Sequence, residues 1–571
     1  MDNIYFLILR RMRKPLLALV TVYSVAVFGL VLIPGRDADG TVWYLGFFHA
    51  FYFVSYMATT IGFGELPREF SDAQRLWTVF CIYLTVTVWI YSVGSLIALL
   101  QDESLQRALA ERRFAASVKR ITTPFFLIVG YGQTGRDLVR ALTSERRRAV
   151  VIDIDRERLN GLQLEKLREF VPSLQADAQC PDVLLSGGLR HPMCQAVLAL
   201  TSSNEVNLKV ALAAKLLHPE VTIIGRSDSH DISANMLSFD TDYVLNPFEI
   251  FALYLRVALT AHCHTVLNDW LGALRGAQLG EPRKPPSEGR WILCGFGRFG
   301  KAVYRELSPG GTELMVIEQS PEHTGTPSTA WIHGRGTEAE TLEQAGIREA
   351  VGLIAGTDND ANNLSIIMTA RVLNPELFVV VRENHMVNED LFAAVDADIR
   401  MHPSLIVANR IRTLLRSPLL ARFFDLARDQ NEEWACALVS RVAAMIQEQA
   451  PEVWEFGIDG DDSPALMDAA DLGLKPHLVD LLKDPRAVDA SLSAIALLHQ
   501  RGTRLDLLPD PHGTLIQPGD RLLFCGSASA RTRMRWNQVD IDVLSTTLGR
   551  PPQVGWLWRQ LRPHLPARWQ T

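Results

Sequence analysis

Two long uncharged stretches, separated by a shorter apolar one, dominate the first hundred residues. Residues 16–33 form an uncharged run of 18 residues, and residues 76–100 form one of 25. At the rise of an α-helix, 25 residues extend about 37 Å, so both runs are long enough to cross a bilayer. Residues 43–58 are apolar and aromatic but too few to cross, which favours a re-entrant helix. We therefore expect a two-helix membrane domain over residues 1–100.

Basic residues stand outside both long runs. Four precede the first run (Arg10, Arg11, Arg13 and Lys14), and five follow the second (Arg107, Arg112, Arg113, Lys119 and Arg120). The positive-inside rule then predicts a multi-pass protein of the cell (inner) membrane with its N- and C-termini in the cytoplasm. A basic start before an apolar run also fits a signal peptide, but this run is long for one and no small-residue cleavage motif follows it.

Between the short apolar stretch and the second run lies the sequence Thr59-Thr60-Ile61-Gly62-Phe63-Gly64-Glu65. Non-helical backbone at membrane depth is tolerated only where it lines a pore or is buried in protein. Gly62 and Gly64 can take backbone angles that point successive carbonyls towards one axis, where they replace the water around a cation. The alternative is an ordinary glycine-containing loop between two anchors. One chain supplies only one set of carbonyls, so a pore requires several copies.

This run resembles the potassium-channel signature, Thr-Val-Gly-Tyr-Gly-Asp in its commonest form, with Ile61, Phe63 and Glu65 as departures. The resemblance implies a homotetramer in membrane lipid, with K⁺ as the permeant ion and a selectivity filter formed by Thr59, Thr60, Ile61, Gly62, Phe63 and Gly64. Phe63 lacks the tyrosine hydroxyl, which bears on the degree of selectivity. A nonselective cation channel of the same architecture is the alternative.

Gly94 lies late in the second apolar run. It is either a site of close helix packing or a hinge for opening the inner end of a pore. No helix carries arginine at every third position, so we do not expect a voltage sensor.

The chain after residue 100 has a different pattern. Residues 101–120 favour a charged helical connector, and residues 125–129 form an apolar strand pattern followed by Gly130-Tyr131-Gly132-Gln133-Thr134-Gly135. A second strand pattern at residues 149–152 ends in Asp153. A strand, a glycine turn, a helix and a strand ending in an acid together predict a Rossmann-type domain.

This pattern occurs twice. Gly295, Gly297, Gly300 and Glu318 repeat the glycines and the acid at a displacement of 165 residues. Further along, Thr201, Asn207 and Arg226 match Thr357, Asn363 and Arg382 at a displacement of 156. We infer an internal duplication, with domains at residues 121–285 and 286–430 joined by the proline-rich linker at 280–286.

Tandem Rossmann-type domains behind a two-helix pore resemble the RCK (regulator of potassium conductance) domains of ligand-gated potassium channels. Residues 431–535 are similar to the small α+β subdomain that follows such domains, and residues 536–571 are unassigned. The expected fold is therefore an all-α membrane pore domain, two Rossmann-like α/β domains and this subdomain. The resemblance implies a ring of eight RCK domains per tetramer that acts on the pore through the connector.

The first glycine turn predicts a nucleotide site. Gly130, Gly132, Gln133 and Gly135 can hold phosphates at a helix N-terminus, and Asp153 can bind ribose hydroxyls while repelling a 2′-phosphate. This favours NAD or an adenine nucleotide (ADP or ATP) as a cytoplasmic ligand. The resemblance further places Asp177 and Ala178 near the adenine, with Thr201, Asn204 and Arg226 lining the cleft. Gly295, Gly297, Gly300 and Glu318 give a weaker second site. The alternative is that the glycine turns serve only helix–sheet packing.

Other classes of partner and site are disfavoured. A net charge of −7 argues against nucleic acid. Seven scattered cysteines with no C-x-x-C pair predict neither disulfides nor a zinc site. Calcium is a possible ligand, but Asp459, Asp461 and Asp462 do not have EF-hand spacing and favour a solvated loop. No acid/base pair accompanies the glycine turns, so we do not expect an enzyme. A membrane-anchored nucleotide-dependent oxidoreductase is the alternative, and it leaves the Gly62–Gly64 loop unexplained.

Overall fold

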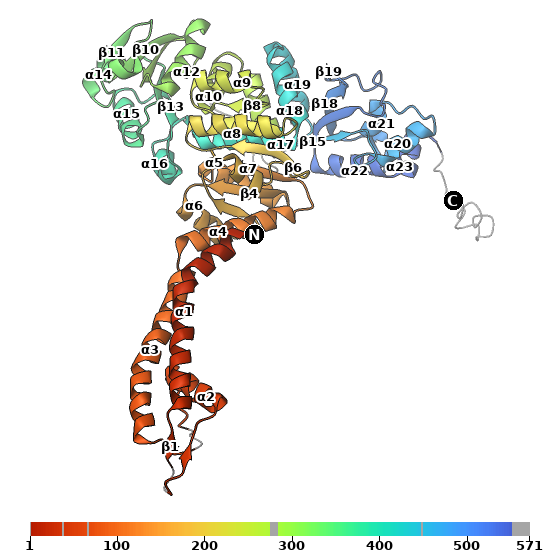
Figure 1. Ribbon diagram of the computed structural model, residues 1–571. Coiled ribbons are helices and arrows are strands. Elements are labelled where there is room, and N and C mark those ends of the chain that lie inside the picture. Colours follow the sequence, from red (N-terminus) through yellow and green to blue (C-terminus); the bar gives the residue numbers. More distant parts are fainter. Residues whose placement is uncertain (1, 37–38, 65–67, 274–283, 447–448, 551–571) are drawn as a thin grey trace, which may run out of the picture. The chain divides into compact units, whose positions relative to one another are not determined.

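The computed structural model describes residues 2–36, 39–64, 68–273, 284–446 and 449–550 (Figure 1). The chain divides into two units, which are described separately. The first comprises residues 1–122 with the short pieces 172–174 and 185–191, and the second comprises the remainder.

The first unit contains two helices with the length and composition of membrane spans. These are α1 (Asp2–Leu32) and α3 (Asp72–Leu100), and only 22% and 17% of their most apolar windows are buried. A core helix of a soluble protein would be mostly covered, whereas a bilayer satisfies an exposed apolar surface. Both helices therefore have the length, the composition and the exposed apolar surface expected of the predicted spans.

Between the spans lies the short helix α2 (Phe47–Ala58), which begins after the two-stranded pair of β1 (Gly35–Arg36) and β2 (Val42–Trp43). Its buried residues pack with α1 and α3 in a small core that includes Leu30 and Val54. Gly29 allows α1 to approach α3, because a Cβ there would lie 2.2 Å from the Trp77 ring. The connector forms α4 (Glu103–Lys119), which the Asp102 side chain caps.

A six-stranded sheet has the order β5-β4-β3-β6-β7-β8, and its strands are paired in parallel from β4 to β8. Its strands are β3 (Phe125–Val129), β4 (Arg148–Asp153), β5 (Ser173–Gln175), β6 (Cys194–Ala199), β7 (Thr222–Arg226) and β8 (Tyr243–Leu245). The helices between them are α5 (Gln133–Ser144), α6 (Arg156–Leu164), α7 (Pro181–Ser186), α8 (Asn204–Leu217) and α9 (His230–Ser238).

A second sheet repeats this order as β11-β10-β9-β12-β13-β14. Its strands are β9 (Arg290–Cys294), β10 (Glu313–Glu318), β11 (Trp331–His333), β12 (Gly352–Ala355), β13 (Phe378–Arg382) and β14 (Ile399–Met401). The helical segments are α12 (Arg298–Leu307), η1 (Ser308–Gly310), α13 (Pro321–Thr324), α14 (Ala339–Gln344), α15 (Asp360–Leu373), η2 (Met386–Asn388) and α16 (Glu389–Ala394). The same strand order in both sheets agrees with the duplication inferred from the sequence.

The two Rossmann-like domains exchange helices. Helix α10 (Pro247–Thr260) follows the first sheet, yet its Phe251 and Leu255 belong to the core of the second domain. Helix α17 (Pro403–Arg416) follows the second sheet, yet its Val407 and Ile411 belong to the core of the first. Because each apolar helix face is buried against the other domain's sheet, the two domains stabilise each other.

The C-terminal subdomain has a four-stranded antiparallel sheet in the order β15-β20-β18-β19, beside the short pair β16–β17. Its strands are β15 (Glu452–Gly457), β16 (Lys483–Asp484), β17 (Ala487–Ser491), β18 (Ala494–Arg501), β19 (Arg504–Leu507) and β20 (Arg521–Gly526). Its helices are α20 (Pro464–Asp471), α21 (Leu478–Leu482), α22 (Ala528–Val539) and α23 (Ile541–Thr547). The expected end at residue 535 is wrong, because Met534 and Leu544 from the last two helices are buried in the same core.

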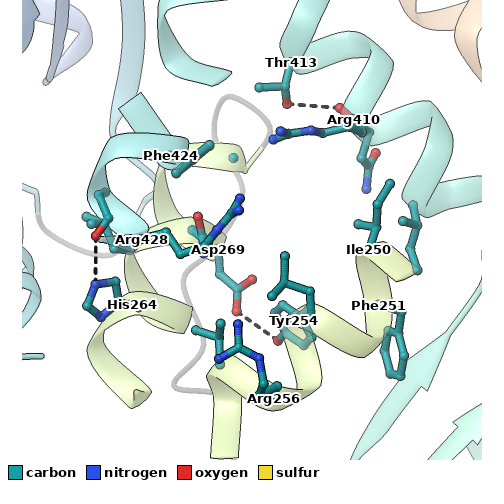
Figure 2. Close-up of a pocket in the computed structure, with 18 of the residues that line it drawn as sticks. Ile250, Phe251, Tyr254, Arg256, His264, Asp269, Arg410, Thr413, Phe424 and Arg428 are labelled. Atoms are coloured by element: carbon teal, nitrogen blue, oxygen red, sulfur yellow. Dashed lines mark hydrogen bonds between the residues drawn. The ribbon is translucent and has the colours of Figure 1, made fainter. Parts of the chain in front are cut away.

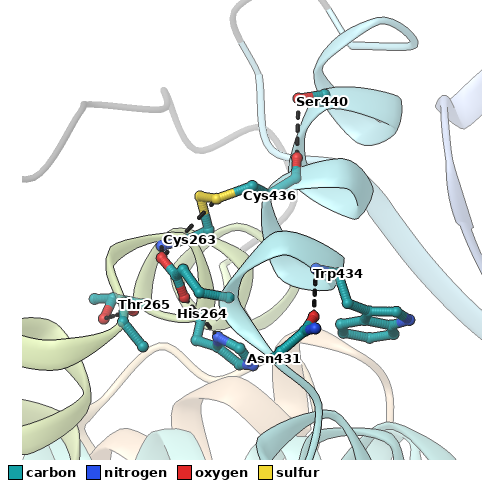
Figure 3. Close-up of a disulfide and its surroundings, with 9 residues drawn as sticks. Cys263, His264, Thr265, Asn431, Trp434, Cys436 and Ser440 are labelled. Atoms are coloured by element: carbon teal, nitrogen blue, oxygen red, sulfur yellow. Dashed lines mark hydrogen bonds and ion pairs between the residues drawn. A yellow bond between two sulfur atoms is a disulfide. The ribbon is translucent and has the colours of Figure 1, made fainter.

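The expectation that the chain forms no disulfide is also wrong. Cys263 on α11 (His262–Gly272) is bonded to Cys436 on α19 (Glu432–Ala443), as Figure 3 shows. These cysteines are 173 residues apart in the sequence. Their spacing therefore carries no signal, and only the packing of α11 against α19 brings the sulfur atoms together.

Candidate functional site

The loop after α2 has an alternating backbone. Thr60, Gly62 and Gly64 have φ angles of +62°, +61° and +72°, whereas Thr59, the C-cap of α2, has a φ of −80°. Left-handed geometry at every second residue turns successive carbonyls to one side of the strand. The Tyr56 carbonyl anchors the loop by accepting bonds from the amides of Ile61 (3.0 Å) and Gly62 (3.3 Å). This is the backbone geometry that an ion-coordinating loop requires.

The side chains of this loop have few partners within one chain. Ile61 is 60% exposed and Phe63 is 68% exposed, although the Phe63 ring contacts the buried Tyr56 at a centroid distance of 6.1 Å. The exposed side chains of Ile61 and Phe63 leave an apolar surface on this loop that contacts with other copies of the chain would cover. Helix α2 ends at Thr59 next to the loop, so its partial negative end favours a cation there. Glu65 lies outside the described residues.

Gly94 is exposed within an unbroken α3, and a Cβ added there would meet no atom within 4 Å. Close packing within the chain therefore does not explain this glycine. The tight glycine contact between the spans is made by Gly29, which the sequence reasoning did not identify.

The first glycine turn connects β3 to α5 at the point where the strand order of the sheet reverses. Gly130 has a φ of +101°, and a Cβ there would lie 2.8 Å from the Thr201 amide nitrogen. At Gly135 a Cβ would lie 2.1 Å from the Gly130 carbonyl oxygen. Gly132 is the N-cap of α5 and provides no capping side chain, so it leaves the helix N-terminus open to an anion. The exposed Gln133 is the first residue of this helix.

The acid at the end of β4 braces the glycine turn. Asp153 is buried and accepts hydrogen bonds from the backbone amides of Tyr131 (2.5 Å) and Asp155 (2.7 Å). Glu318 makes the equivalent bonds in the second domain, to the amides of Phe296 and Ser320. Both acids therefore brace their glycine turns, and the ribose contact expected from the sequence stays a prediction.

A residue outside the predicted site locks the strand ends together. The Asn207 side chain donates to the carbonyls of Thr201 and Arg226, both at 2.9 Å, and accepts from the amide and hydroxyl of Thr201. Asn363 makes the same four bonds to Thr357 and Arg382. Asn207 and Asn363 match at the displacement of 156 residues, so the duplication in the sequence already indicated that this asparagine has a shared role.

The remaining predicted residues also lie at the carboxyl edge of the first sheet. Asn204 begins α8 and exchanges hydrogen bonds with Asp228 at 2.6 and 3.1 Å. Asp177 is exposed after β5, and the adjacent Ala178 is buried. Arg226 ends β7, where burial lowers the pKa of its guanidinium group although Asp228 opposes this shift. In this fold such an edge is where ligands bind.

The second domain contributes a cation to this edge. Arg298, the first residue of α12, forms an ion pair of 2.7 Å with Asp228 of the first domain. The equivalent residue of the first domain is the neutral Gln133, and the equivalent of Asp228 is Asn384. The charged bridge is therefore made on one side only of this duplicated arrangement, and Arg298 is a site residue that the sequence reasoning missed.

The second cleft is more acidic than the first. Asp358 and Asp360 stand where the first domain has Ser202 and Asn204. Asp360 is already bonded to the amides of Asn384 (2.7 Å) and His385 (3.1 Å). The glycine turn of the second domain has the same geometry as that of the first. Gly295 has a φ of +95°, Gly297 is the N-cap of α12, and a Cβ at Gly300 would lie 2.0 Å from the Gly295 carbonyl oxygen.

Acidic residues with possible metal-binding roles are mostly used within the protein. Asp459 caps the following turn through the amides of Asp461 and Asp462. Among the described residues, the one group with metal-ligand spacing is Cys263, Glu432 and Cys436. Its two sulfur atoms are joined in the disulfide.

Comparison with known families agrees with this division of the chain. A model described as an ion channel matches residues 16–102, and a model of the TrkA-N domain matches twice, at residues 126–247 and 291–403.

Individual relatives match over limited regions. An uncharacterised protein of Methanothermus fervidus is 27% identical over 35% of this chain and 32% of its own length. Potassium channel protein 1 of Methanocaldococcus jannaschii is 26% identical over 23% of this chain and 41% of its own length. The chain thus spans less than half the length of these relatives. The solved structure described as the GsuK channel bound to NAD is 16% identical, with a TM-score of 0.43, over 93% of this chain and 98% of its own.

Proposed function

We propose that this chain, which carries an ion-channel domain followed by two TrkA-N domains, forms a homotetrameric potassium-selective channel of the cell membrane, gated by cytoplasmic nucleotides. The observation that carries the proposal is the loop from Thr59 to Gly64. Its alternating φ angles and its place after a short helix between two spans have no use in a membrane anchor. A channel pore gives this loop a function, whereas a membrane-bound oxidoreductase leaves it unexplained.

Ion flux through liposomes containing the purified protein tests this directly. We expect K⁺ to pass in preference to Na⁺. Equal rates for the two ions would favour the nonselective channel instead, for which the absence of a hydroxyl at Phe63 is the relevant feature. The variant Gly62→Asp should abolish flux while cross-linking still shows tetramers. Flux that survives in this variant would place the pore elsewhere.

The regulatory ligand is proposed to be NAD or an adenine nucleotide in the first cleft. The support is the open N-terminus of α5, the acid Asp153 at the end of β4, and the extra cation Arg298 at the same edge. The second cleft repeats the glycine turn but has Asp358 and Asp360 near its opening, and these repel phosphate. We therefore assign the stronger site to the first domain.

Asp153→Asn tests the ribose contact, because asparagine retains one oxygen for the Tyr131 amide and gives up only the bond from the Asp155 amide. We expect the response of channel current to NAD and ADP to be lost or strongly weakened. An unchanged response would remove the first cleft as the regulatory site. The same recordings with Ca²⁺ decide whether that ion acts, since the bonded turn at residues 459–462 offers it no preformed cage.

Coupling between ligand and pore requires little energy at each site. Shifting a gate from 1:99 to 99:1 takes roughly 5.5 kcal/mol, which is about 1.4 kcal/mol for each of four first-domain sites. We propose that the TrkA-N domains act through α4 on the inner end of α3, where Gly94 can serve as the hinge. The cytoplasmic placement of both termini belongs to this proposal.

A further inference from the structure

A large cavity lies apart from both glycine turns. The helical hairpin of α10 and α11 and the hairpin of α17 and α18 (Pro418–Arg428) form most of the lining of an open cavity of about 1280 Å³ (Figure 2). No residue of either glycine turn lines this space. Its volume exceeds the 300–1,000 Å³ that typical small-molecule sites occupy, so it can hold an organic ligand together with water.

The two hairpins are equivalent through the duplication, but their charges differ. At the displacement of 156 residues, Tyr254 corresponds to Arg410, and Asp269 corresponds to Asp425. Arg410 lies 4.0 Å from Asp425, whereas Asp269 has the Tyr254 hydroxyl at 3.4 Å. At these matched positions the α17 wall carries a cation, whereas the wall of α10 and α11 carries a hydroxyl beside a carboxylate. Arg256 of α10 also lines the cavity, but it is paired with Glu306 at 2.9 Å.

Arg410, the cation of the α17 wall, shares its acidic partner with a second arginine. The nearer partner of Asp425 is Arg428, at 3.1 Å, so two guanidinium groups share one carboxylate. Within the described ranges, Arg410 makes no hydrogen bond with another protein group, and burial lowers its pKa. A partly buried guanidinium group with unused donors is a site for an anion, and carboxylates match its planar geometry.

Aromatic side chains form the part of the lining that can receive an apolar body. Phe251 and Tyr254 lie on one hairpin and Phe424 on the other, and Figure 2 shows all three among the residues around the space. Although burial raises the pKa of Asp269 to about 6, this carboxyl is ionised at pH 7.5, so an anion is favoured beside Arg410 and not on the side of Asp269. The lining also carries charged side chains, among them Arg256, Arg428 and Glu432, so the aromatic residues form one part of it.

We propose that this cavity binds a small aromatic carboxylate whose anionic group pairs with Arg410 and whose ring lies against Tyr254 and Phe424. Such a ligand bridges the two hairpins. Because α10 packs on the second domain and α17 packs on the first, the site joins the elements through which the two domains hold each other. The ligand is therefore placed to influence the pair of domains independently of the nucleotide clefts.

The test is calorimetric titration of 4-bromobenzoate into the full chain in lipid nanodiscs, with empty nanodiscs as the blank. We expect one saturable site per chain. Arg410→Gln should weaken binding at least tenfold, as expected for the loss of a charge-assisted hydrogen bond. Thr413→Trp, which fills the cavity from α17, should abolish binding. The control Arg422→Gln removes an exposed arginine of α18 that does not line the cavity, and binding should be unchanged.

ADP titration of each variant separates this site from the nucleotide sites and reports whether the domains remain folded. We expect ADP binding to be the same in all variants and in the presence of 4-bromobenzoate. The proposal is overturned by the absence of saturable 4-bromobenzoate binding, by equal affinities of the Arg410 and Arg422 variants, or by competition with ADP. Loss of ADP binding alone would contradict the nucleotide proposal and leave the cavity result standing.

Discussion

Removing the guanidinium group of Arg298 should weaken nucleotide binding in the first cleft, although Arg298 belongs to the second domain. Its Nη1 lies 2.7 Å from Asp228, which is itself bonded to Asn204 at the start of α8. Asp228 follows the carboxyl end of β7, and α5 begins at the carboxyl end of β3 in the same parallel sheet, so we expect the cation to act on a nucleotide phosphate at this edge. A charge-assisted hydrogen bond contributes about 1.5–3 kcal/mol. Because the Arg298 side chain is 60% exposed, the lower end applies, and we expect Arg298→Gln to weaken ADP binding about tenfold.

The partner substitution has the opposite sign. Asp228→Asn keeps an oxygen for the Asn204 amide but removes a negative charge near the phosphates and releases Arg298 from its ion pair. We expect ADP to bind about threefold more tightly, which corresponds to roughly 0.7 kcal/mol. Two neighbouring substitutions that shift affinity in opposite directions cannot both be explained by a loss of folding.

Calorimetric titration of ADP into the full chain in nanodiscs measures both effects. The matched control is Arg305→Gln, which removes an exposed arginine from the same helix, where its partner is Glu249 at 3.8 Å. Its ADP affinity should match that of the unmodified chain. If Arg298→Gln changes affinity less than twofold, or no more than the control does, the second domain does not contribute to the first cleft.

Three further outcomes are expected. Cys263→Ser should lower the midpoint of thermal unfolding as much as reduction of the disulfide does. The bond to Cys436 closes a loop of 173 residues, which stabilises the fold by up to about 5 kcal/mol in the chain-entropy model. The control Cys180→Ser removes an exposed free cysteine and should not change the midpoint. Asp269→Asn should raise the midpoint of thermal unfolding at pH 7.5 but not at pH 4. Because the pKa of Asp269 in the folded state is raised to about 6, ionisation of this carboxyl lowers the unfolding free energy as the pH rises through 6. Equal shifts of the midpoint at both pH values would contradict this. Asn207→Ala should cost about 3 kcal/mol of unfolding free energy by leaving two strand-end carbonyls unpaired, and a cost below 1 kcal/mol would refute the locking role.

Local patterns were sufficient for much of the architecture. Uninterrupted apolar runs predicted the apolar parts of α1 and α3, although α1 begins at Asp2, well before its apolar run. The glycine turns at 130 and 295 predicted both Rossmann-like sheets, since each turn needs backbone space that a side chain would fill. The positive φ angles at Gly62 and Gly64 were likewise implied by the residue type, whereas that at Thr60 was not.

What the sequence determined by itself was therefore local: helix length, strand alternation and the glycine positions that a tight turn requires. The exchange of α10 and α17, the Arg298–Asp228 bridge, the disulfide at Cys263 and the cavity beside Arg410 depend on tertiary packing. Each of them joins residues from different copies of the duplication or from distant helices. Their spacing along the chain carries no periodic signal, so only the mutual burial of helix faces brings these side chains within reach of one another.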